Sequence, residues 1–296
     1  MLNLAVFTKN RSNPAYGAAR LGAERTAQRL GASVTQYVPE KPDDVEEQIA
    51  LIDQAIATKP DAIVLVPVHP TKINGALTRI VDAGIPLFGM LNEFNEPKPF
   101  VYVGADDVAI GVDIASYLYR HLGGRGDVVI LEGASHSVTS RARVEGFRKA
   151  LETFPGIRIA ATICGDYLRD PAERATKALL ATGATFDAVL TANDDMALGA
   201  LRALDAAGRK CAVVGVNAIP EAVAAIREGR LLATADFNAL AISELATEAA
   251  IRHLEGEKLP KEIILPVEVI DRNNCVAWDR PFEERPSLRW DEVVGA

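Results

Sequence analysis

The stretch Asp187-Ala-Val-Leu-Thr-Ala-Asn-Asp-Asp-Met-Ala-Leu-Gly-Ala200 shows the unit from which most of the chain is built. A short apolar run typical of a buried strand leads through a polar turn into a helical stretch that ends at Ala207-Gly208. The same order occurs earlier, where Asp61-Ala-Ile-Val-Leu-Val66 precedes a helical stretch that ends at Ala83-Gly84. The two blocks begin 126 positions apart in the chain. This weak internal repeat favours two similar α/β lobes over one large sheet.

Alternation of apolar runs and helical stretches continues on both sides of these blocks. It predicts parallel sheets covered by helices. Strands are predicted at Leu2–Thr8, Ser33–Val38, Ala62–Val68, Pro86–Met90, Phe100–Val103, Asp127–Leu131, Arg158–Cys164, Ala188–Thr191, Cys211–Val216 and Leu232–Ala235. Helices are predicted at Pro14–Leu30, Asp43–Thr58, Thr71–Ala83, Thr139–Glu152, Pro171–Ala181, Asp194–Ala206, Pro220–Glu228 and Ala239–Glu255.

Length and charge limit the classes of protein to be considered. A chain of 296 residues predicts about two domains. The formal net charge of −8 argues against a general nucleic-acid binder and against adhesion to an anionic membrane. The longest apolar run, Ala62–Val68, is far shorter than the ~20 residues of a spanning helix, so no membrane insertion is expected. Three cysteines, Cys164, Cys211 and Cys275, predict separate thiols rather than a disulfide framework.

Polar side chains follow the predicted strands at the positions where open parallel sheets bind ligands. Amides, guanidinium groups and aromatic rings are frequent there. Such groups suit a polyhydroxylated ligand, because amides and guanidinium groups pair with hydroxyls and rings cover the C–H face of a sugar. The positions are Lys9 to Asn13, His69-Pro70, Leu91 to Glu93, Ser135 to Arg143, Asp166-Tyr167, Asn193-Asp194, Asn217 and Asp236 to Asn238.

Signatures of enzymes and metal sites are missing. The chain has no phosphate-binding glycine loop, no His-Glu-x-x-His and no Cys-x-x-Cys. The Gly133–Ser137 stretch lacks the final glycine of a nucleophile elbow. We therefore expect no catalytic residues, no metal and no cofactor.

Three segments carry a resemblance to a known family: Asn193-Asp-Asp-Met-Ala-Leu-Gly-Ala-Leu201, Val213-Val-Gly-Val-Asn217 and Arg141-Ala-Arg-Val-Glu-Gly-Phe147. In this order they resemble the periplasmic sugar-binding proteins of the ribose-binding type, the receptors of bacterial ABC importers, over about Leu2 to Asp271. The resemblance implies an α/β fold with two doubly wound parallel-sheet lobes and a ligand enclosed between them. It also implies a three-crossover hinge near 104–107, 236–238 and 265–267. The implied boundaries are 1–105 plus 238–265 for the N-terminal lobe, 106–237 plus 266–276 for the C-terminal lobe, and 277–296 for a surface tail.

The family's ligand-contacting positions fall on residues at the predicted strand ends. They are Asn13, Tyr16, His69, Leu91, Asn92, Arg143, Tyr167, Asn193, Asn217 and Phe237. Six of them have a plainer interpretation: helix cap for Asn193, ion pair for Arg143, half-buried ring for Tyr16 and for Tyr167, loop residue for His69 and hinge packing for Phe237. Related receptors commonly have Asp-Arg where Leu91-Asn92 stand, Asp at Asn217 and often Gln at Phe237. These departures favour a less usual polyol, a furanose or an acid.

The resemblance implies a solute-binding receptor that presents a small polar ligand to the membrane permease of an ABC importer. The alternative is the effector-binding core of a lactose-repressor-type regulator. That alternative needs a helix-turn-helix before the first strand, which here starts at Leu2. A receptor of this kind is periplasmic. No signal peptide is visible at the N-terminus, so either an export signal preceded Met1 or the protein is cytosolic.

Overall fold

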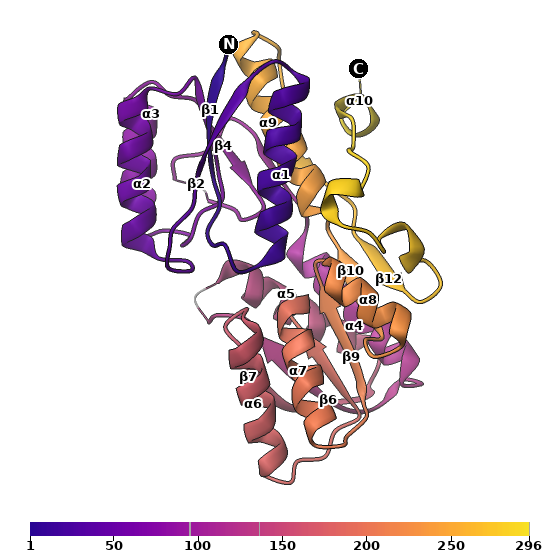
Figure 1. The fold of residues 1–296 in the computed structure, drawn as a ribbon. Helices are drawn as coiled ribbons and strands as arrows, with labels where there is room; N and C mark the ends of the chain where they lie inside the picture. The colour runs from indigo at the N-terminus through magenta and orange to yellow at the C-terminus, as the bar shows by residue number, and fades with distance from the viewer. Residues whose placement is uncertain (95, 136, 296) are drawn as a thin grey trace. The chain divides into compact units, whose positions relative to one another are not determined.

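The computed structural model describes residues 1–94, 96–135 and 137–295 (Figure 1). The chain forms two compact units. The first contains Met1–Ala105, Asn238–Leu265 and Phe282–Ala296, and the second contains Asp106–Phe237 and Pro266–Pro281. The chain therefore passes between the units near the three expected positions and a fourth time after Pro281.

The first unit is a six-stranded sheet in the order β11-β5-β4-β3-β1-β2, with all neighbours parallel. Helices α1 and α9 pack together on one face of the sheet, and α2 and α3 pack together on the other (Figure 1). Because both faces are covered, strand residues such as Val6 and Val64 are fully buried, and the central strands β1, β3 and β4 are largely apolar. The elements are β1 Asn3–Phe7, α1 Pro14–Arg29, β2 Ser33–Tyr37, α2 Val45–Thr58, β3 Ala62–Leu65, α3 Asn74–Asp82, β4 Leu87–Met90, β5 Tyr102–Gly104, α9 Ala239–Leu254, β11 Glu262–Ile264 and α10 Trp290–Val293.

The second unit repeats this plan in the order β12-β10-β9-β8-β6-β7. Helix α4 packs on α5, and α6 packs on α7. The elements are α4 Asp107–His121, β6 Arg125–Glu132, α5 Val138–Lys149, β7 Gly156–Cys164, α6 Arg169–Ala181, β8 Ala188–Thr191, α7 Asp194–Ala206, β9 Ala212–Val216, α8 Pro220–Glu228, β10 Ala233–Asp236 and β12 Glu268–Asp271. The prediction of two parallel-sheet α/β lobes is confirmed.

One strand departs from the predicted parallel arrangement. Strand β12 runs antiparallel to β10, with Glu268 opposite Asp236. The chain leaves this sheet at the carboxyl end of β10 and returns at Pro266 after forming α9 and β11 in the first unit. A strand that re-enters beside the end of its neighbour runs back along it, because a parallel strand would first need a crossover to the opposite edge.

Strands β11 and β12 and helix α4 were missing from the expected elements. Helix α4 was not predicted, although Asp106 caps it by accepting hydrogen bonds from the backbone N–H groups of Val108 and Ala109. The last twenty residues were expected to form one surface tail. The structure instead divides them after Pro281 and buries Trp290, which is 5% exposed beneath the Arg252 guanidinium, in the first unit.

Helices α4 and α5 cross at two glycines. A Cβ on Gly146 would lie 2.2 Å from the carbonyl oxygen of Val108, and one on Gly111 would lie 2.3 Å from that of Arg143. Both near atoms are backbone carbonyl oxygens, so neither can move away by a change of side-chain rotamer. The absence of two side chains thus brings α5 against α4 and explains the glycine in the Arg141–Phe147 segment.

Gly146→Ala is expected to destabilise the protein by about 1–3 kcal/mol, because the added methyl forces the two helices apart. Urea unfolding followed by circular dichroism measures this change. Gly75→Ala is the matched control, since Gly75 also lies in a helix but has open space around its Cβ position. The control should be neutral or gain up to about 1 kcal/mol. Equal stability of Gly146→Ala and the wild type would contradict the crossing argument.

Candidate functional site

Strained backbone marks the carboxyl ends of the strands. Among the described residues, eight non-glycine residues have a positive φ angle. Such angles cost about 1–3 kcal/mol each and persist where the surroundings enforce them, often at ligand sites. Six of the eight come one to three residues after a strand: Leu91 after β4, Asp166 and Tyr167 after β7, Asn217 and Ala218 after β9, and Asn238 after β10.

In the first unit, the segment after β1 places Asn13 at the N-terminus of α1. Its Oδ1 accepts a hydrogen bond from the backbone N–H of Ala15 at 3.0 Å, and its own N–H donates to Asn10 Oδ1 at 2.9 Å. Asn13 is 9% exposed, and its side-chain oxygen is already engaged in capping α1. Its ligand role stays a prediction.

A buried cation stands in the same segment: Lys9, which was among the polar residues expected after the first strand but not among the predicted ligand contacts. Lys9 is 7% exposed, its Nζ lies 3.9 Å from Asp43 Oδ1, and it lies 5.8 Å from the centre of the Tyr16 ring. Asn10 is also buried and donates to the same carboxylate at 3.3 Å. A lysine is rarely this buried without a polar partner. Its position directly after a predicted strand was the only signal that the sequence offered.

The remaining predicted residues of this unit follow β3 and β4. His69 Nδ1 accepts hydrogen bonds from the backbone N–H groups of Thr71 and Lys72, both at 3.2 Å, which leaves the ring proton on Nε2. Leu91 has a φ angle of 65°, and its carbonyl accepts from the Tyr102 hydroxyl at 3.1 Å. That conformation turns the chain sharply and positions Asn92, whose backbone N–H donates to the carbonyl of Met90 at 2.7 Å.

In the second unit, Arg143 is ion-paired as well as buried. It is 4% exposed, its Nε donates to Asp107 Oδ1 at 2.8 Å, and its Nη1 donates to the carbonyl of Ala192 at 2.7 Å. The guanidinium carbon lies 5.1 Å from the centre of the Phe237 ring. The structure thus brings two predicted site residues together and gives Arg143 a structural role beside any ligand role.

Asn193 and Tyr167 are also held together. Asn193 Oδ1 accepts from the backbone N–H of Met196 at 2.9 Å and caps α7, while its Nδ2 donates to the carbonyl of Tyr167 at 3.1 Å. Asn193 is only 1% exposed. The amide therefore holds the strained turn that carries the Tyr167 ring and also caps α7, and its ligand role stays a prediction.

Asn217 differs from Asn13 and Asn193, whose side-chain oxygens cap helices. It directly follows β9 with a φ angle of 122° and is 7% exposed. Its Oδ1 is buried and has no hydrogen-bond partner among the residues that the structure describes. A buried acceptor left in this way costs about 1–3 kcal/mol, so a donor from outside the chain would relieve it.

The end of β10, next to Phe237, is hydrogen-bonded to a residue that the sequence placed in the tail. Trp278 Nε1 donates to Asp236 Oδ2 at 2.7 Å, and Asp236 is 7% exposed. Trp278 was missed as a neighbour of the site, because 42 positions separate it from Asp236 in sequence. Phe237 itself is 8% exposed and packs beneath Arg143.

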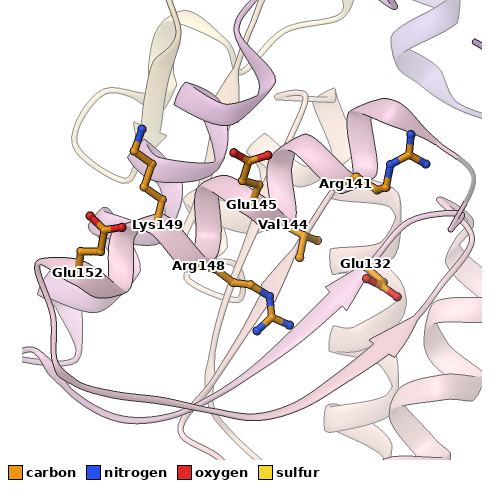
Figure 2. A pocket seen from close by; sticks show the side chains of 7 residues that line it. All are labelled: Glu132, Arg141, Val144, Glu145, Arg148, Lys149 and Glu152. Atoms are coloured by element: carbon orange, nitrogen blue, oxygen red, sulfur yellow. The ribbon is translucent and has the colours of Figure 1, made fainter.

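A separate hollow of about 630 Å³ lies along the outer side of α5 in the second unit (Figure 2). Figure 2 shows acidic and basic side chains alternating around it, and none of them is a predicted ligand contact. Its lining residues are Glu132, Arg141, Val144, Glu145, Arg148, Lys149 and Glu152. The predicted stretch Ser135 to Arg143 includes His136, which lies outside the described residues.

Other chemistry is limited within the described ranges. No group of three or more His, Cys, Asp or Glu side chains is placed there to hold a metal ion. In the part of the chain that the structure covers, no helix is long and apolar enough to cross a bilayer. Cys164, Cys211 and Cys275 are free thiols, which confirms the expectation of separate cysteines.

Two α/β units with buried, strained polar residues at their strand ends define a binding protein for a small polar solute. The family described as periplasmic binding protein domain matches residues 4–258, and the chain belongs to this family, in its ribose-binding branch. The chain is 29% identical over 246 residues to the xylitol-binding protein of Mycolicibacterium smegmatis, covering 82% of this chain and 70% of the relative. It is 28% identical over 268 residues to the ribose import binding protein of Bacillus subtilis, covering 90% and 86%.

A solved structure gives the same result. An ABC transporter periplasmic solute-binding protein from Actinobacillus succinogenes, with bound D-allose, superposes with a TM-score of 0.89 at 28% identity, covering 93% of this chain and 99% of that one. These comparisons support a solute-binding protein of the ABC importer type over the core of a lactose-repressor-type regulator. The relatives are binding proteins, as the missing enzyme signatures predict.

Arg143→Ala is expected to lower the free energy of unfolding by about 2–4 kcal/mol, because it leaves the Asp107 carboxylate without its partner. Urea unfolding measures the loss. Arg143→Ala combined with Asp107→Asn should recover part of it, since no unpaired charge then remains. Arg141→Ala, an exposed arginine on the same helix, is the control and should stay within about 0.5 kcal/mol of the wild type. An unchanged stability for Arg143→Ala would contradict the structural role.

Proposed function

We propose that the protein captures a small polyhydroxylated solute outside the cytoplasmic membrane and delivers it to the permease of an ABC importer. The observation that carries the ligand class is the buried Oδ1 of Asn217, which has no partner among the described residues. A hydroxyl donates to such an oxygen and accepts from the same amide's N–H, so a polyol satisfies both groups. The relatives named for xylitol, ribose and allose support this class.

The predicted contacts of both units supply complementary chemistry to such a ligand. Asn13, Tyr16, His69 and Asn92 belong to the first unit, and Arg143, Tyr167, Asn193, Asn217 and Phe237 belong to the second. The amides and the His69 ring can form hydrogen bonds with ligand hydroxyls. The rings of Tyr16, Tyr167 and Phe237 can pack against the C–H face of a sugar. We propose that the two sets contact one ligand and that Lys9 adds a cation to the first set.

Three positions that differ from the usual receptor residues restrict which ligands can bind tightly. Leu91 offers no side-chain acceptor, and Asn92 and Asn217 are amides where related receptors commonly have charged groups. Each unmatched hydroxyl costs about 1 kcal/mol or more. We therefore propose that an acyclic polyol, a furanose or a sugar acid binds more tightly than ribose, glucose or galactose.

A thermal-shift screen over xylitol, D-allose, D-ribose, D-glucose, D-galactose and sugar acids tests this proposal. A ligand present at about 1,000 times its dissociation constant stabilises the folded state by ~4 kcal/mol. We expect a clear rise in melting temperature with at least one polyol or acid and a smaller rise with ribose. Amino acids are the control and should give none. A panel without any shift would contradict the ligand class, and a submicromolar dissociation constant for ribose would contradict the narrower specificity.

Asn217→Gly tests the residue on which the proposal depends. Glycine adopts a φ angle of 122° without strain, so this variant removes the amide and leaves the turn permitted. The dissociation constant of the best ligand, measured by calorimetry, should rise about tenfold or more, which corresponds to ~1.4 kcal/mol. Asn273→Ala, an exposed asparagine of the same unit, should leave it unchanged. Unaltered affinity of Asn217→Gly would contradict the assignment of Asn217.

A further inference from the structure

Asp194 is a buried carboxylate that the proposed ligand contacts do not include. It is the first residue of α7 and is 0% exposed. Its Oδ1 accepts from the Thr234 hydroxyl at 2.6 Å, and its Oδ2 accepts from the backbone N–H of Ile219 at 3.0 Å. One side chain thus connects the start of α7 to β10 and to the loop after β9.

The loop after β9 is the strained turn that carries Asn217. Asn217 and Ala218 have φ angles of 122° and 49°, and the backbone N–H of Ala218 donates to the Thr234 hydroxyl at 3.3 Å. Thr234 therefore bridges the turn to Asp194, and Ile219 closes the same connection from the other side. Room for the carboxylate comes from Gly215 on β9, where a Cβ would lie 2.1 Å from Asp194 Oδ1.

We propose that Asp194 is a positioning residue that holds the turn at 217–218 in its left-handed conformation and so directs the Asn217 amide toward the ligand. The inference deepens the proposed function and rests on it where the ligand is concerned. A buried donor without a partner is unfavourable, so the Ile219 N–H and the Thr234 hydroxyl tie the turn and β10 to the Asp194 oxygens. Strained turns persist where such contacts over-determine them.

The charge state of Asp194 gives this role a measurable signature. Burial raises the pKa of Asp194 to about 7, the nearby charge of Asp236 on β10 also raises it, and the Thr234 and Ile219 bonds and Arg143 on α5 lower it. A carboxyl whose folded pKa is raised stabilises the fold below its unfolded pKa of about 4, and this contribution is lost as the pH rises toward 7. The Ile219 amide should sense the same protonation directly.

The first experiment needs no ligand. In the wild type, the amide proton resonance of Ile219 should shift with pH with a midpoint near pH 7, whereas Asp194→Asn should show no such shift. Asp195→Asn is the matched control. Asp195 is the next buried carboxylate on α7, and it accepts from the backbone N–H of Arg169 at 2.8 Å instead of from the turn. The control should titrate as the wild type does. A shift that persists in Asp194→Asn would assign it to another group, such as Asp236, and overturn the proposal.

Hydrogen exchange tests the mechanical part of the proposal. Asp194→Ala removes both acceptors, and the protection factors of the Ile219 and Ala218 amides should fall at least tenfold, with Asp194→Asn between this variant and the wild type. Should Asp194→Ala fail to fold, Thr234→Val tests the bridge, with Thr234→Ser as the rescue and Thr176→Val, a buried threonine on α6, as the control. Unchanged protection at Ala218 in Thr234→Val would count against the bridge.

A double-mutant cycle with xylitol as the probe connects the turn to binding. Asp194→Asn should weaken xylitol about threefold or more in the wild-type chain and less than twofold in the Asn217→Gly chain, because the effect acts through Asn217. Equal losses in both chains would overturn the positioning role. If xylitol does not bind the wild type, xylitol is excluded as a ligand of the proposed function. The resonance and exchange measurements then still decide the role of Asp194.

Discussion

Parallel strands end at one edge of their sheet, and the candidate site of this protein depends on that constraint. In each unit the strands that share an edge deliver their following residues to the same place. Asn13, His69 and Leu91-Asn92 follow β1, β3 and β4, and Tyr167, Asn193, Asn217 and Phe237 follow β7, β8, β9 and β10. The exceptions to this rule lie on helices, as Arg143 does on α5, and the Gly111–Gly146 crossing brings that helix close to α4.

Strained backbone at the strand ends is the second feature on which the candidate site depends. Left-handed backbone after β4, β7, β9 and β10 turns the chain abruptly at each strand end. Side chains from neighbouring turns then hold these conformations: Asn193 fastens the Tyr167 turn, and Asp194 fastens the Asn217 turn. The Asn193-Asp194 pair of the family segment therefore holds two strained turns at strand ends from a single helix start. This explains in physical terms why an amide and a carboxylate stand side by side there.

Much of the architecture could be predicted from the sequence, because buried parallel strands and capped helices leave strong patterns. The strand before Asn193 and the helix after it were predicted with the observed bounds. The direction of β12 was not predictable from its own residues, since it is set by where the chain returns from the first unit. Helix α4 was missed despite its Asp106-Asp107 start, because it lies at the boundary between the two predicted series.

The site was predicted less completely, since partners far apart in sequence leave no local pattern. The Asp107 partner of Arg143 is 36 positions away, and the Trp278 partner of Asp236 is 42 positions away. Residue type and position alone also could not separate Asn193, whose amide is used within the protein, from Asn217, whose buried oxygen has no partner among the described residues. Only the geometry of the turns distinguishes an amide that caps a helix from one whose buried oxygen is left without a partner among the described residues.

The most direct measurement of the central claim is a map of amide chemical-shift changes as the best ligand of the screen is added. The account predicts that the largest changes fall on residues that follow β1, β4, β7, β9 and β10, in both units, with Asn217 and its turn among them. Changes confined to the charged hollow along α5, or to one unit alone, would contradict it.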